Sequence, residues 1–264
     1  GMTGIFNNSN YLGIWLNIIW PFALVFFIDN LNYPKKRLIS FIFLISIFLC
    51  TILTFSRNAW LGFTIASILI LGIKSLKWII PSLTLIVTPV LIGLGFLPNN
   101  FLTEIIRNVV PNIIFHQFNS SATDHIRMQI WESSMNYISQ KPLIGWGASS
   151  FPELFKIKNG EVFFAHTHNL PLEIALSFGI PAAFIIITTM IYLLYFSRAK
   201  VFVPKQSQNK SLYDKAWWVS TLIFFFSHMF DVQYFDVRIG LTFWILLGGI
   251  RNIMKQDFKN LSIK

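Results

Sequence analysis

Charged residues are scarce in this chain of 264 residues. They make up 12% of the sequence, whereas hydrophobic residues make up 54%. Soluble domains usually carry about 25% charged residues. This scarcity excludes an ordinary water-soluble domain and predicts a protein embedded in a membrane.

Cysteine is nearly absent as well. Cys50 is the single cysteine and lies inside an apolar segment. The chain therefore has neither an intramolecular disulfide nor a cage of cysteine ligands around a metal ion. A signal peptide is not indicated at the start, because the first basic cluster follows the first apolar run instead of preceding it.

Long apolar runs are what the sequence does contain. A helix needs roughly 20 mostly apolar residues to cross a hydrocarbon core about 30 Å thick. By this criterion the fold class is an all-α polytopic membrane protein with about seven transmembrane helices. The seven runs cover about 10–28, 38–55, 59–73, 77–97, 169–196, 216–231 and 239–252.

Lysine and arginine predict how these helices are oriented. Two thirds of the basic residues follow the first, third, fifth and seventh runs, and basic residues accumulate on the cytoplasmic side of a membrane. The N-terminus is then outside and the C-terminus cytoplasmic. The net charge of +10 therefore reflects orientation, and we expect no nucleic-acid partner.

The same pattern predicts the domain organisation. Transmembrane helices 1–4 occupy 1–97, a large outer loop with short helices occupies 98–168, helices 5–7 occupy 169–252, and 253–264 form a cytoplasmic tail.

The outer loop contains a predicted helix over about 124–139. Asp124 is a suitable N-cap and Pro142 ends the run. Arg127 and Trp131 are four residues apart and share one face. The neighbouring apolar face carries Ile126, Ile130 and Tyr137.

Two further features of the loop are weaker. A stretch from Phe101 to Val110 is amphipathic and would lie on the membrane surface. The "GWG" at 145–147 predicts a turn.

Arg57 is the first candidate functional residue. It stands in "LTFSRNAWLGF", between two apolar runs on the expected outer side. One interpretation is an arginine that extends its charged group to the membrane interface. We favour a second, an anion-binding role, because the charge bias disfavours a basic residue there and a guanidinium binds phosphate through two hydrogen bonds.

The "HTHN" sequence at 166–169 is the second candidate. Residues two apart in an extended segment share one face, so His166 and His168 would point into one cavity. A metal site needs a third ligand, for which His116, His125 and Glu161 are available. Histidines that only pack at an interface are another possibility. We favour a histidine that accepts a proton from a substrate.

Three other polar positions accompany these candidates. Arg127 forms either a surface ion pair with Asp124 or a second phosphate or sugar contact. Glu173 follows the histidines by one helical turn, so it would orient a histidine or bind an acceptor sugar. The last outer turn is expected to be a small polar end cap, with charged residues Asp231, Asp236 and Arg238 beside His228.

Five motifs in this order resemble the O-antigen ligase and O-antigen polymerase superfamily. They are "GIFNNSNYLG", "TFSRNAWLG", Arg127 with Trp131, "KPLIGWGASSF" and "HTHNLPLEIALSFGIPA", and they span residues 1–185. The resemblance implies a GT-C-like glycosyltransferase at the outer face of the inner membrane. It would transfer a glycan from a polyprenyl-pyrophosphate carrier to a hydroxyl of a lipid or glycan acceptor, with inversion and without a metal or other cofactor.

The resemblance also implies roles for particular residues. Arg57 and Arg127 would bind the pyrophosphate, and His168 would be the base, with His166 as the second candidate. Asn169 and Glu173 are further substrate-binding candidates. Members of the superfamily usually have more than seven spans, so we expect a short member or the C-terminal part of a longer protein.

Two other functions stay open at the level of sequence. One branch of the superfamily has been labelled as bicarbonate transporters, and "SRNAWLG" resembles that branch. Arg57 would then hold a small anion. The third possibility is a membrane assembly protein without catalytic activity.

Overall fold

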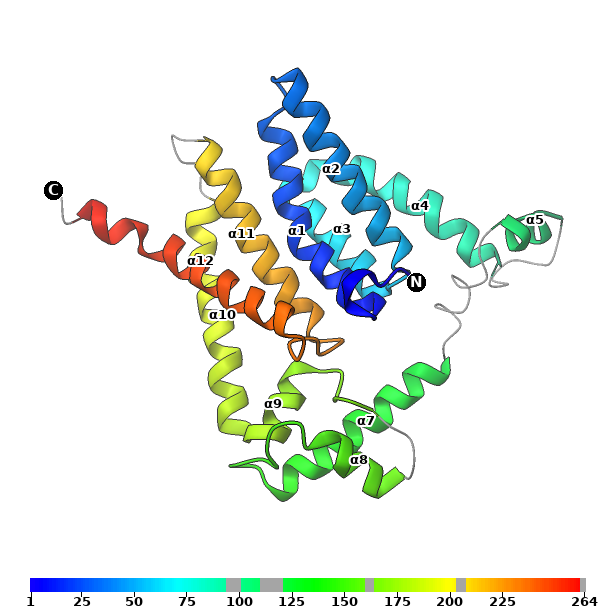
Figure 1. Cartoon of the computed structure of the whole chain (residues 1–264), viewed down its shortest axis with the longest axis vertical. Coiled ribbons are helices and arrows are strands. Elements are labelled where there is room, and N and C mark those ends of the chain that lie inside the picture. Colours follow the sequence, from blue (N-terminus) through cyan, green and yellow to red (C-terminus); the bar gives the residue numbers. More distant parts are fainter. Residues whose placement is uncertain (94–100, 110–120, 160–163, 203–207, 262–264) are drawn as a thin grey trace. The chain divides into compact units, whose positions relative to one another are not determined.

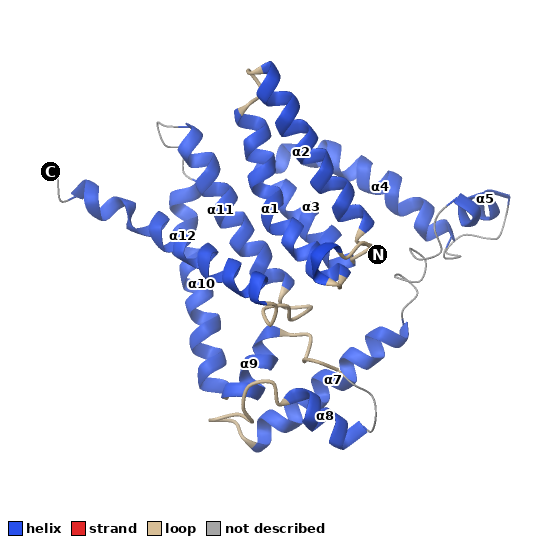
Figure 2. Cartoon of the chain, in the orientation of Figure 1, coloured by secondary structure: helices blue, strands red, loops and turns tan. Residues whose placement is uncertain are grey.

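The computed structural model describes residues 1–93, 101–109, 121–159, 164–202 and 208–261 (Figure 1). Within these ranges the chain is helical and contains no strand, as Figure 2 shows. This confirms the all-α class. The chain divides into two compact units, residues 1–122 and 123–264, which are described separately below.

The first unit is built on three packed helices followed by two more. Its elements are the 3₁₀ helices η1 (Gly4–Phe6) and η2 (Ile73–Ser75), and the α-helices α1 (Ser9–Asp29), α2 (Pro34–Leu53), α3 (Arg57–Leu71), α4 (Leu76–Gly93) and α5 (Phe101–Val109). Close packing of α1 on α3 depends on Gly13, where an added Cβ would lie 2.6 Å from the Ala59 Cβ. Farther along, Trp20 Nε1 donates to Ser67 Oγ at 2.8 Å.

The chain bends sharply after α3. This helix has 15 residues, about 22 Å of rise, which is too short to cross a hydrocarbon core. Gly72 has a φ of 84° and ends it. The next helix departs at 119°, so residues 57–82 qualify together as one broken span or a re-entrant loop. The sequence predicted two separate spans, over 59–73 and 77–97.

The second unit contains six helices in the residues that the structure describes. They are α7 (Ser121–Gln140, whose first two residues fall in the first unit), α8 (Phe151–Asn159), α9 (Leu170–Phe178), α10 (Ile180–Phe202), α11 (Gln208–Ser227) and α12 (Val237–Leu261). The helix predicted over 124–139 is α7. It begins three residues before Asp124, so this residue lies in the first turn and is not the N-cap.

The core of this unit lies beneath α7, as the apolar pattern predicted. Ile130 is fully buried against the apolar side chains of α8 and α9. Ile126 and Tyr137 pack against the same cluster.

The prediction of a single helix over 169–196 is wrong. It is two helices, α9 and α10, separated at Gly179 with a φ of 89°. The 141–147 loop replaces the next helical turn, because Trp146 N–H donates to the Leu176 carbonyl and Gly147 N–H donates to the Ser177 carbonyl. An added Cβ at Gly179 would lie 2.2 Å from the Leu143 carbonyl oxygen, so the junction requires glycine.

Among the described residues, four helices are long and apolar enough to cross a membrane. They are α1, α2, α10 and the part of α12 from Val237 to Lys255, and the bent pair raises the number to five. These helices make the chain a multi-pass membrane protein. In the part of the chain that the structure describes, the seven-span count is not reached, because α3 is short and the first two turns of α11 contain Lys210, Asp214 and Lys215.

Candidate functional site

The histidine segment before α9 is held by hydrogen bonds at its centre. Thr167 N–H donates to Glu173 Oε2 at 2.8 Å, and Trp131 Nε1 on α7 donates to the Thr167 carbonyl at 3.0 Å. Thr167 itself is fully buried. Both backbone groups of this residue are therefore satisfied from different helices, which fixes the segment in place.

Asn169 links the segment to α9 and to the turn after α11. Its Oδ1 accepts from Leu172 N–H at 3.1 Å, which makes it the N-cap of α9. Its Nδ2 donates to the Met229 carbonyl at 3.0 Å. Both ends of this amide serve the backbone, so Asn169 has a structural role in addition to the predicted substrate contact, which stays a prediction.

Glu173 is completely buried one turn into α9. Its Oε2 accepts the Thr167 N–H described above. Among the described residues, no group donates to its Oε1. This carboxyl group therefore orients the backbone between the two histidines. Its two suggested roles, orienting a histidine or binding an acceptor sugar, stay predictions.

Asp231 is the residue that completes the site. It lies in the turn between α11 and α12, and its Oδ1 is 2.9 Å from His168 Nδ1. Its Oδ2 accepts from Gln233 Nε2 at 3.1 Å. Asp231 is only 5% exposed, so its assignment to a solvated end cap is wrong.

Asp236 and Arg238 fit the end-cap prediction, whereas His228, which was grouped with them, is completely buried. Asp236 and Arg238 form an ion pair of 2.6 Å near the surface. The sequence did not distinguish Asp231 from Asp236 and Arg238, because all three lie close together after the same apolar run. Gln233 was missed for the same reason.

His166 stands beside His168, and their ring centroids are 4.3 Å apart. The backbone N–H of His168 donates to His166 Nδ1 at 3.3 Å. His166 Nε2 then carries the proton and faces Asp231 Oδ1 at 3.8 Å. The rings converge as predicted, although the segment is not continuously extended, because His168 has a φ of 56°.

The charges of this group follow from its surroundings. Burial would raise the pKa of Asp231, but the hydrogen bond from His168, the charges of both histidines and the Gln233 bond lower it to about 2. Burial, followed by the neighbouring His168, lowers the pKa of His166 to about 4. At neutral pH Asp231 is therefore a carboxylate and His166 is neutral.

The negative charge of Asp231 determines which nitrogen of His168 can accept a proton. A carboxylate only accepts hydrogen bonds, so His168 Nδ1 carries the proton that points to Asp231. The lone pair is then on Nε2, and among the described residues no group hydrogen bonds to Nε2. The His168 side chain is 24% exposed.

Arg127 lies one helical turn before Trp131 on α7 and is half-buried. Residues four apart share a helix face, so Arg127 stands on the side of α7 that meets the histidine segment. Its suggested partner Asp124 has a side chain outside the described residues. The phosphate role of Arg127 stays a prediction.

The model of the family described as O-antigen ligase matches residues 39–187, which is more than half of the chain. The chain belongs to the O-antigen ligase family. This is a family of membrane glycosyltransferases of the ligase and polymerase type. A search of curated proteins found no match.

The match places most candidate residues of this O-antigen ligase family member inside the family region. Arg57, Arg127 and the "HTHN" segment all fall within it, whereas Asp231 lies beyond its end. The carboxylate that holds His168 is therefore supplied by a part of the chain outside the matched region.

Arg57 is the first residue of α3 in this ligase family member and is half-buried. Ser56 caps the helix by accepting from Ala59 N–H. Helix N-termini attract anions, and the anion-binding role of Arg57 stays a prediction. Arg57 belongs to the first unit and His168 to the second, and their convergence stays a prediction.

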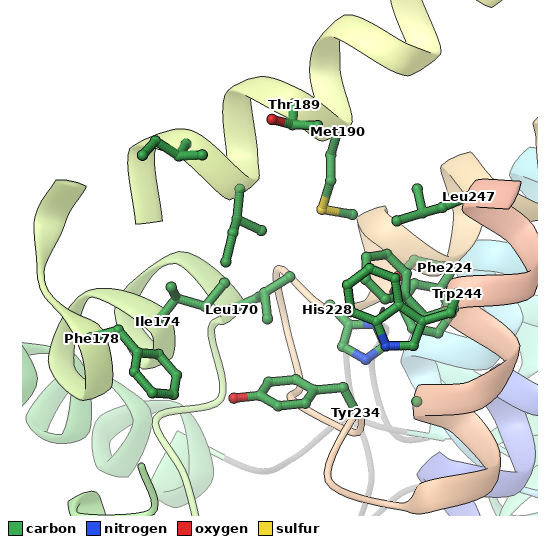
Figure 3. Close-up of a pocket in the computed structure, with 14 residues that line it drawn as sticks. Leu170, Ile174, Phe178, Thr189, Met190, Phe224, His228, Tyr234, Trp244 and Leu247 are labelled. Carbon is green, nitrogen blue, oxygen red and sulfur yellow. Dashed lines mark hydrogen bonds between the residues drawn. The ribbon is translucent and has the colours of Figure 1, made fainter. Parts of the chain in front are cut away.

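An apolar pocket of about 340 Å³ lies in the second unit between α9, α10, α11 and α12. Figure 3 shows Leu170, Ile174 and Phe178 of α9 on one side, and Phe224, His228 and Trp244 on the other. The Leu170 N–H donates to the His228 carbonyl, so the pocket begins at the end of the histidine segment. Its lining suits a hydrocarbon chain.

The structure leaves one part of the metal prediction open. His116 and Glu161 lie outside the described residues, as does the side chain of His125. The third group near the two histidines is Asp231, whose ligand atoms and theirs all lie within 4.8 Å of one another.

Proposed function

We propose that this protein transfers a glycan from a polyprenyl-pyrophosphate carrier to an acceptor hydroxyl at the outer face of the inner membrane. Membership of the O-antigen ligase family supports the reaction class. The observation that carries the proposal is the Asp231–His168 pair, in which the buried carboxylate holds Nδ1 of a partly exposed imidazole.

In this proposal His168 is the catalytic residue. An alcohol is a weak nucleophile at neutral pH, so it is activated when a base accepts its proton as the new bond forms. The acceptor oxygen attacks the anomeric carbon, the carbon–oxygen bond to pyrophosphate breaks, and the pyrophosphate leaves with the electron pair. The proton ends on His168 Nε2, and a single displacement inverts the anomeric centre.

Asp231 is a positioning residue in the same step. It selects the tautomer of His168 and stabilises the imidazolium that forms when the proton arrives, as in other acid–histidine pairs. Because both groups are protein side chains that together accept a proton, the proposed step requires no metal ion.

Arg57 and Arg127 would bind the pyrophosphate. Charge builds on the leaving phosphate in the transition state, and fixed guanidinium groups stabilise it strongly in a site poor in water. The apolar pocket would hold a hydrocarbon chain of the donor or the acceptor.

Two alanine variants test this function. We expect His168→Ala and Arg57→Ala to insert into the membrane at normal levels and to lose surface glycan on a gel. The control is Arg238→Ala, which removes an exposed arginine that pairs with Asp236. Normal glycan in both test variants would count against the glycosyltransferase.

A second candidate function has one observation in its favour. The 119° bend between α3 and the next helix resembles the broken helices that hold ions in secondary transporters. We propose small-anion transport as the alternative, with Arg57, at the opposite end of α3 from the bend, as the anion ligand. Uptake of labelled bicarbonate by proteoliposomes, abolished by Arg57→Ala and unaffected by His168→Ala, would favour it.

A further inference from the structure

We infer that His166, His168 and Asp231 form a binding site for a divalent transition metal such as Zn²⁺, and that the bound metal inhibits glycan transfer. The binding rests on the geometry of the three side chains. The inhibition rests in addition on the proposed role of His168.

The three ligand atoms are already gathered. His168 Nδ1 is 2.9 Å from Asp231 Oδ1, His166 Nε2 is 3.8 Å from the same oxygen, and all three atoms lie within 4.8 Å of one another. Zn²⁺ binds histidine nitrogen and carboxylate oxygen at about 2.0–2.2 Å in tetrahedral sites, which places neighbouring ligands roughly 3.4 Å apart. The observed distances bracket this separation, so shifts of about 1 Å or less complete the site.

The donor set also selects the metal. Two imidazole nitrogens and one carboxylate oxygen suit Zn²⁺, Co²⁺ or Ni²⁺ better than Mg²⁺ or Ca²⁺, which prefer oxygen ligands. Three protein ligands leave a fourth position for water or substrate. The partial exposure of His168, at 24%, provides a path of entry.

Groups around the ligands hold them in place. Gln233 Nε2 donates to the second oxygen of Asp231, and Trp131 and Glu173 hold the backbone between the two histidines. Such outer hydrogen bonds orient metal ligands and strengthen binding.

Binding has a cost that makes the metal a reversible ligand. The metal needs the lone pairs of His168 Nδ1 and His166 Nε2, so each ring must move its proton to its other nitrogen. In His166 that nitrogen is Nδ1. Once protonated, Nδ1 faces the backbone N–H of His168 at 3.3 Å and loses the weak hydrogen bond that it accepted from this group. The site should therefore bind metal less tightly than a structural zinc site does.

The same proton shift explains the inhibition. With the metal on Nδ1, the proton of His168 is on Nε2, the nitrogen that would accept the proton of the acceptor hydroxyl. The metal also takes the carboxylate that stabilises the imidazolium. Both ring nitrogens of His168 are therefore occupied, Nδ1 by the metal and Nε2 by the proton, so the ring cannot act as a base.

The experiment measures metal binding directly on the full chain in detergent, purified through a tag without histidine. Titration with Co²⁺ should give one visible absorption band that Zn²⁺ displaces at a 1:1 ratio. We expect Asp231→Asn, His166→Ala and His166→Gln each to weaken binding at least tenfold, whereas Asp236→Asn leaves it unchanged. Circular dichroism and size exclusion confirm folding, and a second histidine substitution guards against misfolding of the first.

Inhibition is tested separately from binding. Zn²⁺ added to the wild-type protein should abolish transfer with the affinity measured by displacement, and a chelator should restore it. Absence of 1:1 binding, or binding that survives all three substitutions, overturns the metal site whatever the enzymatic activity is. Binding without an effect on an active enzyme overturns the inhibition.

Discussion

At Asp231, a single residue determines the chemistry of its neighbour. The carboxylate is buried and charged, and it accepts the proton on His168 Nδ1. Without it, the imidazole would be free to place its proton on either nitrogen. The lone pair on Nε2 is therefore a consequence of a residue 63 positions away in the chain.

The Asp231→Asn substitution tests this role. Asparagine has nearly the same shape but is neutral, and its amide can favour the wrong tautomer of His168. We expect kcat for glycan transfer to fall by roughly 10²–10⁴-fold with little change in KM. The measurement is steady-state transfer to an acceptor by the purified protein in nanodiscs.

Asp236→Asn is the matched control, since Asp236 lies in the same turn and pairs with Arg238 outside the site. Equal rates for the two variants, or a change in KM alone for Asp231→Asn, would remove Asp231 from the catalytic step.

At the scale of elements, the junction between α9 and α10 is fixed by the 141–147 loop. The 141–147 loop binds the last carbonyl groups of α9, and Ile180 N–H donates to the Pro142 carbonyl. The loop also meets the backbone at Gly145, where an added Cβ would lie 2.6 Å from Ser177 and Phe178 backbone atoms. The motifs "KPLIGWG" and "SFGIPA" are thus two halves of one contact.

Gly179→Ala should destabilise this contact. Alanine is strained at a φ of 89°, and its Cβ would meet the Leu143 carbonyl oxygen at 2.2 Å. We expect a loss of roughly 2–4 kcal/mol in stability, seen as a lower midpoint of thermal unfolding by size-exclusion chromatography. Gly248→Ala is the control, because nothing lies within 4 Å of its added Cβ, and it should be neutral or slightly stabilising. Equal midpoints for the two variants would contradict the role of Gly179.

At the scale of the whole molecule, the distribution of basic residues predicts orientation. The expected arrangement places the 98–168 loop outside and the C-terminal end of α12 in the cytoplasm. His168 would then lie on the outer side of the membrane, where the proposed transfer takes place.

Cysteine labelling tests the orientation in a Cys50→Ser background, since Cys50 is the single cysteine. We expect Leu143→Cys to react with an impermeant maleimide in intact cells, because Leu143 is 72% exposed and lies in the predicted outer loop. Lys255→Cys near the end of α12 should react only after permeabilisation. The reverse pattern would invert the topology and place His168 on the cytoplasmic side.

The sequence by itself determined the membrane class and most helix positions, and it singled out the histidine segment as a candidate. These features depend on local composition and on spacing along one helix, so neighbouring residues are enough to predict them. The apolar face of α7 and the partner required by Glu173 follow from the same local rules.

Only the tertiary structure decided that Asp231 joins His168, that Glu173 holds Thr167, and that the helix predicted over 169–196 breaks at Gly179. In each case the deciding contact joins groups that the chain's own periodicity does not connect: a turn beyond α11, a backbone N–H ahead of α9, or a loop carbonyl. Hydrogen-bond partners and close backbone approaches of this kind exist only once the helices have packed, because packing sets which polar groups are buried together and must satisfy one another.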